Sequence, residues 1–89
     1  ISKAIELDPD NNDYILEKAS LHLRVGQAEQ ALEIMEKLVA IMPDDPDVQR
    51  LTGISYLRCN DKENACEHLS QARILGDELV ESIIEQSCR

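Results

Sequence analysis

Apolar side chains recur along the chain at the spacing of an amphipathic helix, in short stretches separated by turn residues. The clearest stretch covers residues 28–41, where Ala28, Ala31, Met35 and Leu38 share one helix face. Similar patterns predict helices over residues 12–24, 46–58, 62–75 and 78–88, and the end of another helix over residues 1–7. The sequence therefore predicts an all-α protein built from short helices.

The same pattern returns every 34 residues. Pro9 and Pro43 are 34 positions apart, and so are Gly26 and Asn60. A fixed period of this length is typical of repeat proteins, in which each helix pair buries its apolar face against its neighbours. We therefore expect a single domain over residues 1–89, divided into the tail of one repeat (1–9), two repeats (10–43 and 44–77) and a capping helix (78–89). Because Ile1 falls inside an expected helix, the chain is expected to be a piece of a longer protein.

Glycine and asparagine at special positions refine this prediction. Gly53 lies in the middle of an expected helix, where glycine is about 1 kcal/mol less favourable than alanine. We therefore expect another helix to approach its backbone closely. Asn60 replaces the glycine found at Gly26, and asparagine is the next-best residue for the left-handed conformation that ends a helix. Gly76 should end the fourth helix, and Asp77 should cap the last one.

The repeated residues resemble the tetratricopeptide repeat family, whose 34-residue helix–turn–helix unit follows the pattern W-x2-L-G-x2-Y…A-x3-F…P. The residues at these pattern positions are Ile15-x2-Lys18-Ala19-x2-His22, Ala31-x3-Met35 and Pro43 in the first unit, and Gln49-x2-Thr52-Gly53-x2-Tyr56 and Ala65-x3-Leu69 in the second. Lys18, His22 and Gln49 depart from the pattern, because apolar or aromatic residues are usual there. The resemblance covers about residues 1–77. It implies about two and a half hairpins in a short right-handed α-solenoid, closed by a capping helix.

The resemblance also implies that the first helix of each unit lines a concave groove for a peptide or a partner helix. The groove positions are Asp13, Leu16, Ser20, Leu23 and Arg24 in the first unit, and Asp47, Arg50, Ile54, Leu57 and Arg58 in the second. These residues predict a partly apolar groove rimmed with arginine, suited to a peptide with apolar anchors and an acidic group. The expected function is a non-catalytic scaffold or adaptor that binds another protein. The alternative is a structural segment of a longer array, in which the same apolar residues pack against other repeats or an oligomer mate.

Composition narrows the classes of partner and activity. The net charge of −9 argues against nucleic acid or an anionic membrane as partner, because both require a basic surface. No apolar run approaches the roughly 20 residues needed to span a bilayer. His22 and His68 are the only histidines, and neither belongs to a recognisable nucleophile motif, so we expect no catalytic site and no cofactor. His22 is expected to fill a packing site, and His68 to lie at the surface.

Three cysteines leave two arrangements open. Cys66 and Cys88 lie at similar distances on either side of the turn at residues 76–77, so they should face each other across an antiparallel helix pair. Free thiols in a reducing cytosol are the favoured expectation, and a Cys66–Cys88 disulfide in an oxidising compartment (periplasmic or extracellular) is the alternative. A zinc site that combines these two with Cys59 and His68 is disfavoured, because no C-x2-C spacing occurs.

Overall fold

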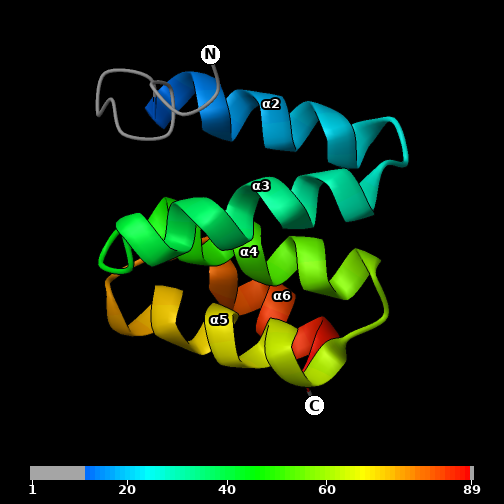
Figure 1. Ribbon diagram of the computed structural model, residues 1–89. Coiled ribbons are helices and arrows are strands. Elements are labelled where there is room, and N and C mark those ends of the chain that lie inside the picture. Colours follow the sequence, from blue (N-terminus) through cyan, green and yellow to red (C-terminus); the bar gives the residue numbers. More distant parts are fainter. Residues whose placement is uncertain (1–11, 89) are drawn as a thin grey trace.

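The computed structural model describes residues 12–88, so the helix end expected over residues 1–7 and the repeat tail over residues 1–9 lie outside the described residues. Within residues 12–88 the chain forms no strands and five helices, namely α2 (Asn12–Arg24), α3 (Ala28–Ile41), α4 (Pro46–Arg58), α5 (Lys62–Ile74) and α6 (Val80–Ser87) (Figure 1). The prediction of an all-α fold is confirmed.

The helices are antiparallel neighbours that stack in chain order. α2 packs on α3, α3 on α4, α4 on α5 and α5 on α6, and α2 also contacts α4. α2 and α4 run in the same direction, so their C-terminal ends lie at the same side of the stack (Figure 1). This is the arrangement expected for two consecutive helix–turn–helix units followed by one further helix.

Local sequence signals set the ends of the helices. α4 begins at Pro46 after Asp45, whose side chain accepts hydrogen bonds from the backbone N–H groups of Asp47 (2.9 Å) and Val48 (3.4 Å). Asn60 has a φ of 64°, so it takes the left-handed conformation that its position predicted. α2, α3 and α4 begin and end where the sequence predicted, and α5 ends one residue earlier than expected.

The last helix starts later than expected. The sequence predicted it over residues 78–88 with Asp77 as its cap, whereas α6 covers Val80–Ser87. The Asp77 carboxylate accepts a hydrogen bond from the backbone N–H of Leu79 at 2.9 Å. Asp77 therefore caps the turn that leads into α6 rather than the helix itself.

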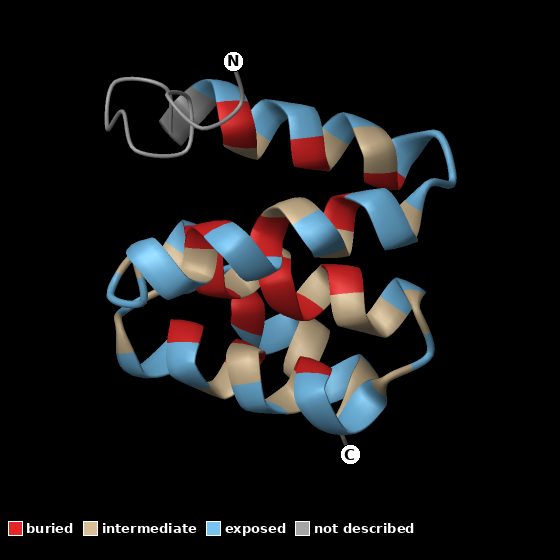
Figure 2. Cartoon of the chain, viewed as in Figure 1, coloured by how far each residue is buried: buried red, intermediate tan, exposed pale blue. Residues whose placement is uncertain are grey.

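Two apolar clusters make the core (Figure 2). The larger cluster joins α2, α3 and α4, and it contains Ile15, Ala19, Leu23, Ala31, Met35, Leu38 and Val48. The smaller cluster joins α5 to α6 and contains Leu69, Ala72 and Val80. Several of these residues are alanines, and small side chains let helix backbones approach closely.

Gly53 marks a close approach between α4 and α5. A Cβ atom added at this position would lie 2.7 Å from Cγ of Leu69 and 3.1 Å from the backbone oxygen of Ala65. Both residues are fully buried, so neither can move aside without disturbing the core. The expectation that another helix approaches Gly53 is confirmed.

Candidate partner-binding surface

α2 and α4 contact each other, and the residues that the sequence assigned to a partner-binding groove belong to these two helices. Leu16 and Ile54 are half-buried and pack against the edge of the larger core cluster. Ser20 is also half-buried, whereas Arg24 and Arg58 are exposed at the C-terminal ends of the two helices. We refer to these five residues as the α2–α4 surface.

Two further leucines expected in the groove pack on the core clusters and are covered to different degrees. Leu23 is only 6% exposed and belongs to the larger core cluster. Leu57 is half-buried and packs against the smaller cluster, which joins α5 to α6. The family pattern predicts which side of a helix a residue lies on, but it does not say how far neighbouring helices cover that side. The side chain of Asp13, also expected there, lies outside the part of the chain that is described.

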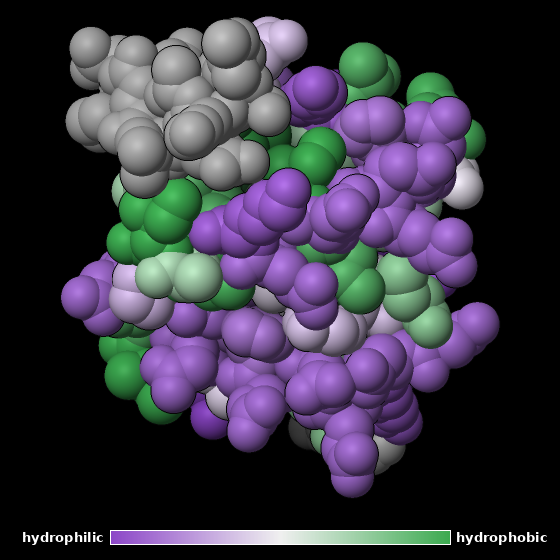
Figure 3. Space-filling model, viewed as in Figure 1, coloured by the Kyte–Doolittle hydropathy of each residue, from purple (hydrophilic) through white to green (hydrophobic). Residues whose placement is uncertain are grey.

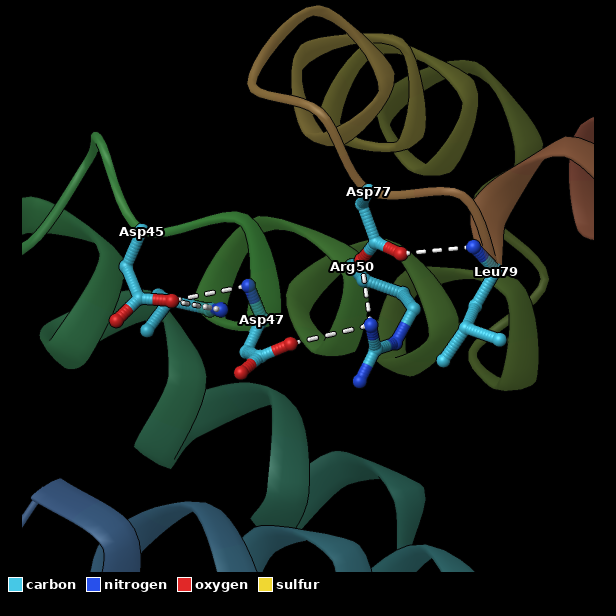
Figure 4. Close-up of polar contacts among 6 residues, drawn as sticks. Asp45, Asp47, Arg50, Asp77 and Leu79 are labelled. Carbon is cyan, nitrogen blue, oxygen red and sulfur yellow. Dashed lines mark hydrogen bonds and ion pairs between the residues drawn. The ribbon is translucent and has the colours of Figure 1, made fainter.

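Arg50 was expected at the rim of the groove, but it is engaged with two carboxylates. Its Nη1 forms an ion pair with Asp77, whose side chain is 5% exposed, and another with Asp47 at 3.2 Å (Figure 4). Asp77 also accepts the hydrogen bond from Leu79, so Arg50 ties α4 to the turn before α6. The guanidinium therefore serves the fold, and it is not free to receive an acidic peptide as the sequence suggested.

The two remaining arginines gather at the other end of the α2–α4 surface. Arg58 donates from Nη1 to the backbone oxygen of Leu23 at 3.4 Å, which holds its guanidinium beside the C-terminal turn of α2. Arg24 is the last residue of that helix. The C-terminus of a helix carries partial negative charge and favours cations nearby. The α2–α4 surface therefore combines two half-buried aliphatic side chains with two arginines at the C-terminal ends of its helices.

A second group of polar contacts links α4 to α3 and α5. Gln49, which is 6% exposed, donates from Nε2 to the backbone oxygen of Pro43 at 2.8 Å. Its Oε1 lies 2.8 Å from Nδ1 of His68. The His68 ring stacks on Tyr56 with the ring centroids 5.4 Å apart, and the Tyr56 hydroxyl donates to Glu36 at 2.7 Å. The group therefore satisfies a buried amide and joins three helices.

These contacts set the protonation states of His68 and Tyr56. Because the carbonyl of Pro43 can only accept, Gln49 must direct its amide nitrogen there, and its oxygen then requires a donor. Neutral His68 therefore carries its proton on Nδ1. Burial lowers the pKa of His68, which favours this neutral form. The hydrogen bond to Glu36, with burial, raises the pKa of Tyr56 to about 12.

One of the two histidines differs from what the sequence predicted. His68 is half-buried within the polar group rather than lying at the surface. His22, which was expected to fill a packing site, is half-buried, and its Nδ1 lies 2.6 Å from Oε1 of Gln27. Gln49 could have predicted the polar group, because it occupies the position where the repeat pattern has tryptophan. A buried amide at that position requires hydrogen-bond partners.

The cysteines form the Cys66–Cys88 disulfide, which the sequence analysis gave as the alternative to free thiols. Cys66 of α5 and Cys88, just after α6, form a disulfide with Cα atoms 5.8 Å apart, and Cys59 is a free thiol. The disulfide replaces the three free thiols that were favoured. Among residues 12–88, no three histidine, cysteine or acidic side chains come together as metal ligands.

The surroundings of Cys59 disfavour its thiolate form. Burial raises the pKa of its thiol, and the negative charges of Glu29, Asp61 and Glu36 raise it further. The thiolate is the reactive form of cysteine, so a raised pKa lowers reactivity at neutral pH.

The face on which α3 and α5 lie is largely hydrophilic (Figure 3). None of the helices within residues 12–88 is long and apolar enough to cross a membrane.

Helices that return every 34 residues, stack in chain order and pack through alanine and glycine define an α-helical repeat protein. The sequence profile of the tetratricopeptide repeat family matches residues 1–53, which is more than half of the chain. The chain therefore belongs to the tetratricopeptide repeat family. Members of this family generally act as modules that bind other proteins, and they are generally not catalysts.

A curated relative carries the same kind of repeat. Interferon-induced protein with tetratricopeptide repeats 2 from Cricetulus griseus is 32% identical over 72 residues. The match covers 81% of this chain and 15% of the relative, so the chain spans a small part of the relative's length. No solved structure matches the chain.

Proposed function

We propose that the protein is a non-catalytic scaffold that binds a peptide or a partner helix on the α2–α4 surface. The observation that carries this proposal is the arrangement of half-buried Leu16 and Ile54 beside exposed Arg24 and Arg58. Apolar side chains on the partner would cover the two aliphatic residues, and the hydrophobic effect would supply most of the affinity.

The basic end of the surface would determine which peptides bind. Arginine presents several N–H donors in a planar group, and it pairs well with a carboxylate. The protein as a whole carries a net charge of −9, so it repels acidic peptides except where arginines gather. We therefore expect a partner with apolar anchor residues and an acidic group that reaches Arg24 and Arg58.

Selection from a random peptide library displayed on phage, with the protein immobilised, would test this function. The selected peptides should share apolar residues and an aspartate or glutamate. Measured by fluorescence anisotropy, their affinity should fall by about tenfold or more in the double variant Arg24→Glu/Arg58→Glu. The matched control is Lys62→Glu/Arg73→Glu, which makes the same change in net charge on α5.

Two results would refute this assignment. Selected peptides without acidic residues would remove the role of the arginines. An equal loss of affinity in both double variants would mean that overall charge, and not the α2–α4 surface, controls binding. Circular dichroism of each variant would check that the helices remain folded, because Arg58 also contacts the backbone of Leu23.

A second candidate function, as a structural segment of a longer repeat array, is supported by the outer face of α2. Tyr14, Leu21 and Val25 are 54%, 54% and 60% exposed. Val48 and Ser55, which stand 34 positions after Tyr14 and Leu21, are fully buried within the stack. Repeat equivalence therefore suggests that the second helix of a preceding repeat, including the tail proposed for residues 1–9, would cover this face of α2.

Substitution of an exposed leucine would test this second function. In the natural full-length protein, Leu21→Asp should lower the melting temperature by several degrees, because a covered carboxylate is costly. Ile74→Asp at the opposite end of the stack is the matched control, since Ile74 is 73% exposed. A melting temperature unchanged by Leu21→Asp would show that nothing covers α2.

A further inference from the structure

α6 is a short helix whose place in the structure depends on its contacts. It has eight residues, whereas isolated helices below about 12–15 residues are marginal in water. Val80 at its start is fully buried, and half-buried Ile83 and Ile84 pack on the smaller core cluster. Its docking therefore depends on this packing and on the links at its two ends.

The two ends of α6 are anchored by different chemistry. At the N-terminal end, Arg50 and Asp77 hold the preceding turn through an ion pair. At the C-terminal end, Cys88 is the C-cap residue and is bonded to Cys66 in the first half of α5. The ion pair does not depend on redox conditions, but the disulfide does.

The disulfide is open to a reductant in solution. Both cysteines are only half-buried, and Cys66 lines a surface hollow together with Glu63, Glu67 and Ser70. Cys59 has a raised thiol pKa, so its thiolate is scarce and attacks a disulfide slowly. The exposure of the two cysteines therefore leaves the bond accessible to external thiols.

We propose that the Cys66–Cys88 disulfide is a redox modification site that latches α6 onto α5, and that a dithiol reductant opens it. One thiolate of the reductant attacks Sγ of Cys66, the S–S bond breaks, and Cys88 leaves as a thiolate that takes up a proton. The second thiol of the reductant then displaces Cys66, which is protonated in turn. Two electrons and two protons pass to the protein, and the reductant becomes a cyclic disulfide.

Opening the latch changes the surface of the stack. α6 covers Leu69 and Ala72 of α5, and Leu57 of α4 packs against the same cluster. Release of α6 therefore uncovers an apolar area that is buried while the disulfide is intact. The anchor at Asp77 remains, so the C-terminal part of α6 should loosen first. This latch is independent of the binding function proposed for the α2–α4 surface.

The size of the effect follows from the length of chain that the disulfide closes. The two cysteines are 22 positions apart. A cross-link of this span restricts the conformations of the chain with α6 open, and it lowers the equilibrium population of open α6 by ~10²-fold. Reduction should therefore increase the population of open α6 by ~10²-fold and increase amide hydrogen exchange there in proportion.

Hydrogen exchange followed by mass spectrometry, with and without dithiothreitol, tests the latch in a Cys59→Ser background that removes the third thiol. We expect faster exchange over residues 80–88 after reduction, with α3 unchanged as an internal reference. The variant Cys66→Ser/Cys88→Ser should exchange rapidly at α6 in both conditions. Binding of an apolar fluorescent dye should rise in the reduced protein, because the smaller cluster is uncovered.

Each other outcome overturns the proposal. Alkylation of all three cysteines in the wild-type protein without reductant would show that the disulfide does not form. Equal exchange of α6 in both redox states would show that packing alone holds it. Loss of protection across α2 to α5 as well, or failure of the double serine variant to fold, would mean that the disulfide supports the whole fold rather than α6.

Discussion

Gly53→Ala provides a direct test of the packing between α4 and α5. The new methyl group would lie 2.7 Å from Cγ of Leu69, and carbon atoms in ordinary contact are about 3.5–4.0 Å apart. It would also lie 3.1 Å from the backbone oxygen of Ala65, which cannot rotate away. Leu69 is fully buried, so its side chain has no empty space to enter. The substitution must therefore push the two helices apart or force Leu69 out of its rotamer.

Two opposing terms decide the size of the effect. Alanine is favoured over glycine inside a helix by about 1 kcal/mol, so propensity alone predicts stabilisation. Overpacking a tight core typically costs about 1–3 kcal/mol. The net result for Gly53→Ala is a loss of about 1 kcal/mol in the free energy of unfolding. For a domain of this size, that loss lowers the melting temperature by roughly 4–8 °C.

Urea unfolding followed by circular dichroism would measure the effect, and a double-mutant cycle would identify its cause. In a Leu69→Ala background the clash with Cγ is absent, so Gly53→Ala should become neutral or stabilising by up to about 1 kcal/mol. Leu69→Ala alone costs about 2–5 kcal/mol, so the cycle is best measured in a stabilising osmolyte. A gain in stability from Gly53→Ala in the wild-type background, or the same loss in both backgrounds, would refute this explanation.

Two further predictions concern the polar group around α4. In a Tyr14→Phe variant, where Tyr56 is the single phenol, absorbance at 295 nm should show a titration midpoint near pH 12, and Glu36→Gln should move it toward 10. Because the folded-state pKa of Tyr56 is raised above its ordinary value of 10.0, its contribution to stability should be lost between pH 10 and about 12. The pKa of His68 is instead lowered below 6.5, so the unfolded chain binds a proton first as the pH falls. Stability should therefore decrease as the pH drops below about 6.5, and His68→Asn should remove this part of the decrease in thermal melts recorded between pH 7.5 and 5.5.

The sequence predicted the helices well because the signals that define them are local. Pro46 and Asp45 start α4, Asn60 ends it through its left-handed conformation, and the apolar period identifies the buried face of each helix. Gly53 was informative for the same reason, since an unfavourable residue in a helix requires a packing explanation. The repeat also supports these predictions, because the pattern that assigns helices in one unit is found again 34 residues later.

The candidate site was harder to predict because it depends on pairs that are distant in the sequence. Arg50 meets Asp77 across 27 positions, and the sequence alone shows an arginine without showing its partner. Gln49 and His68 form a pair across 19 positions for a similar reason. Leu23 was expected to be exposed in the groove, but it is buried in the larger core cluster. Its exposure is determined by the packing of three helices rather than by its position in α2 alone.

Arg50 also shows how neighbouring helices determine which repeat positions can bind a partner. Arg50 and Leu16 are equivalent in the 34-residue register, but Arg50 is neutralised by Asp77 of the turn before α6. Asp77→Asn should release the guanidinium while keeping an oxygen that accepts the hydrogen bond from Leu79. An acidic peptide selected on the protein should then bind more tightly, and the added affinity should disappear when Arg50→Gln is combined with it. Asp47→Asn is the matched control, because the side chain of Asp47 is 61% exposed and its ion pair at 3.2 Å contributes little. If Asp77→Asn leaves the affinity unchanged, Arg50 lies outside the path of the peptide, and recognition depends on Arg24 and Arg58 alone.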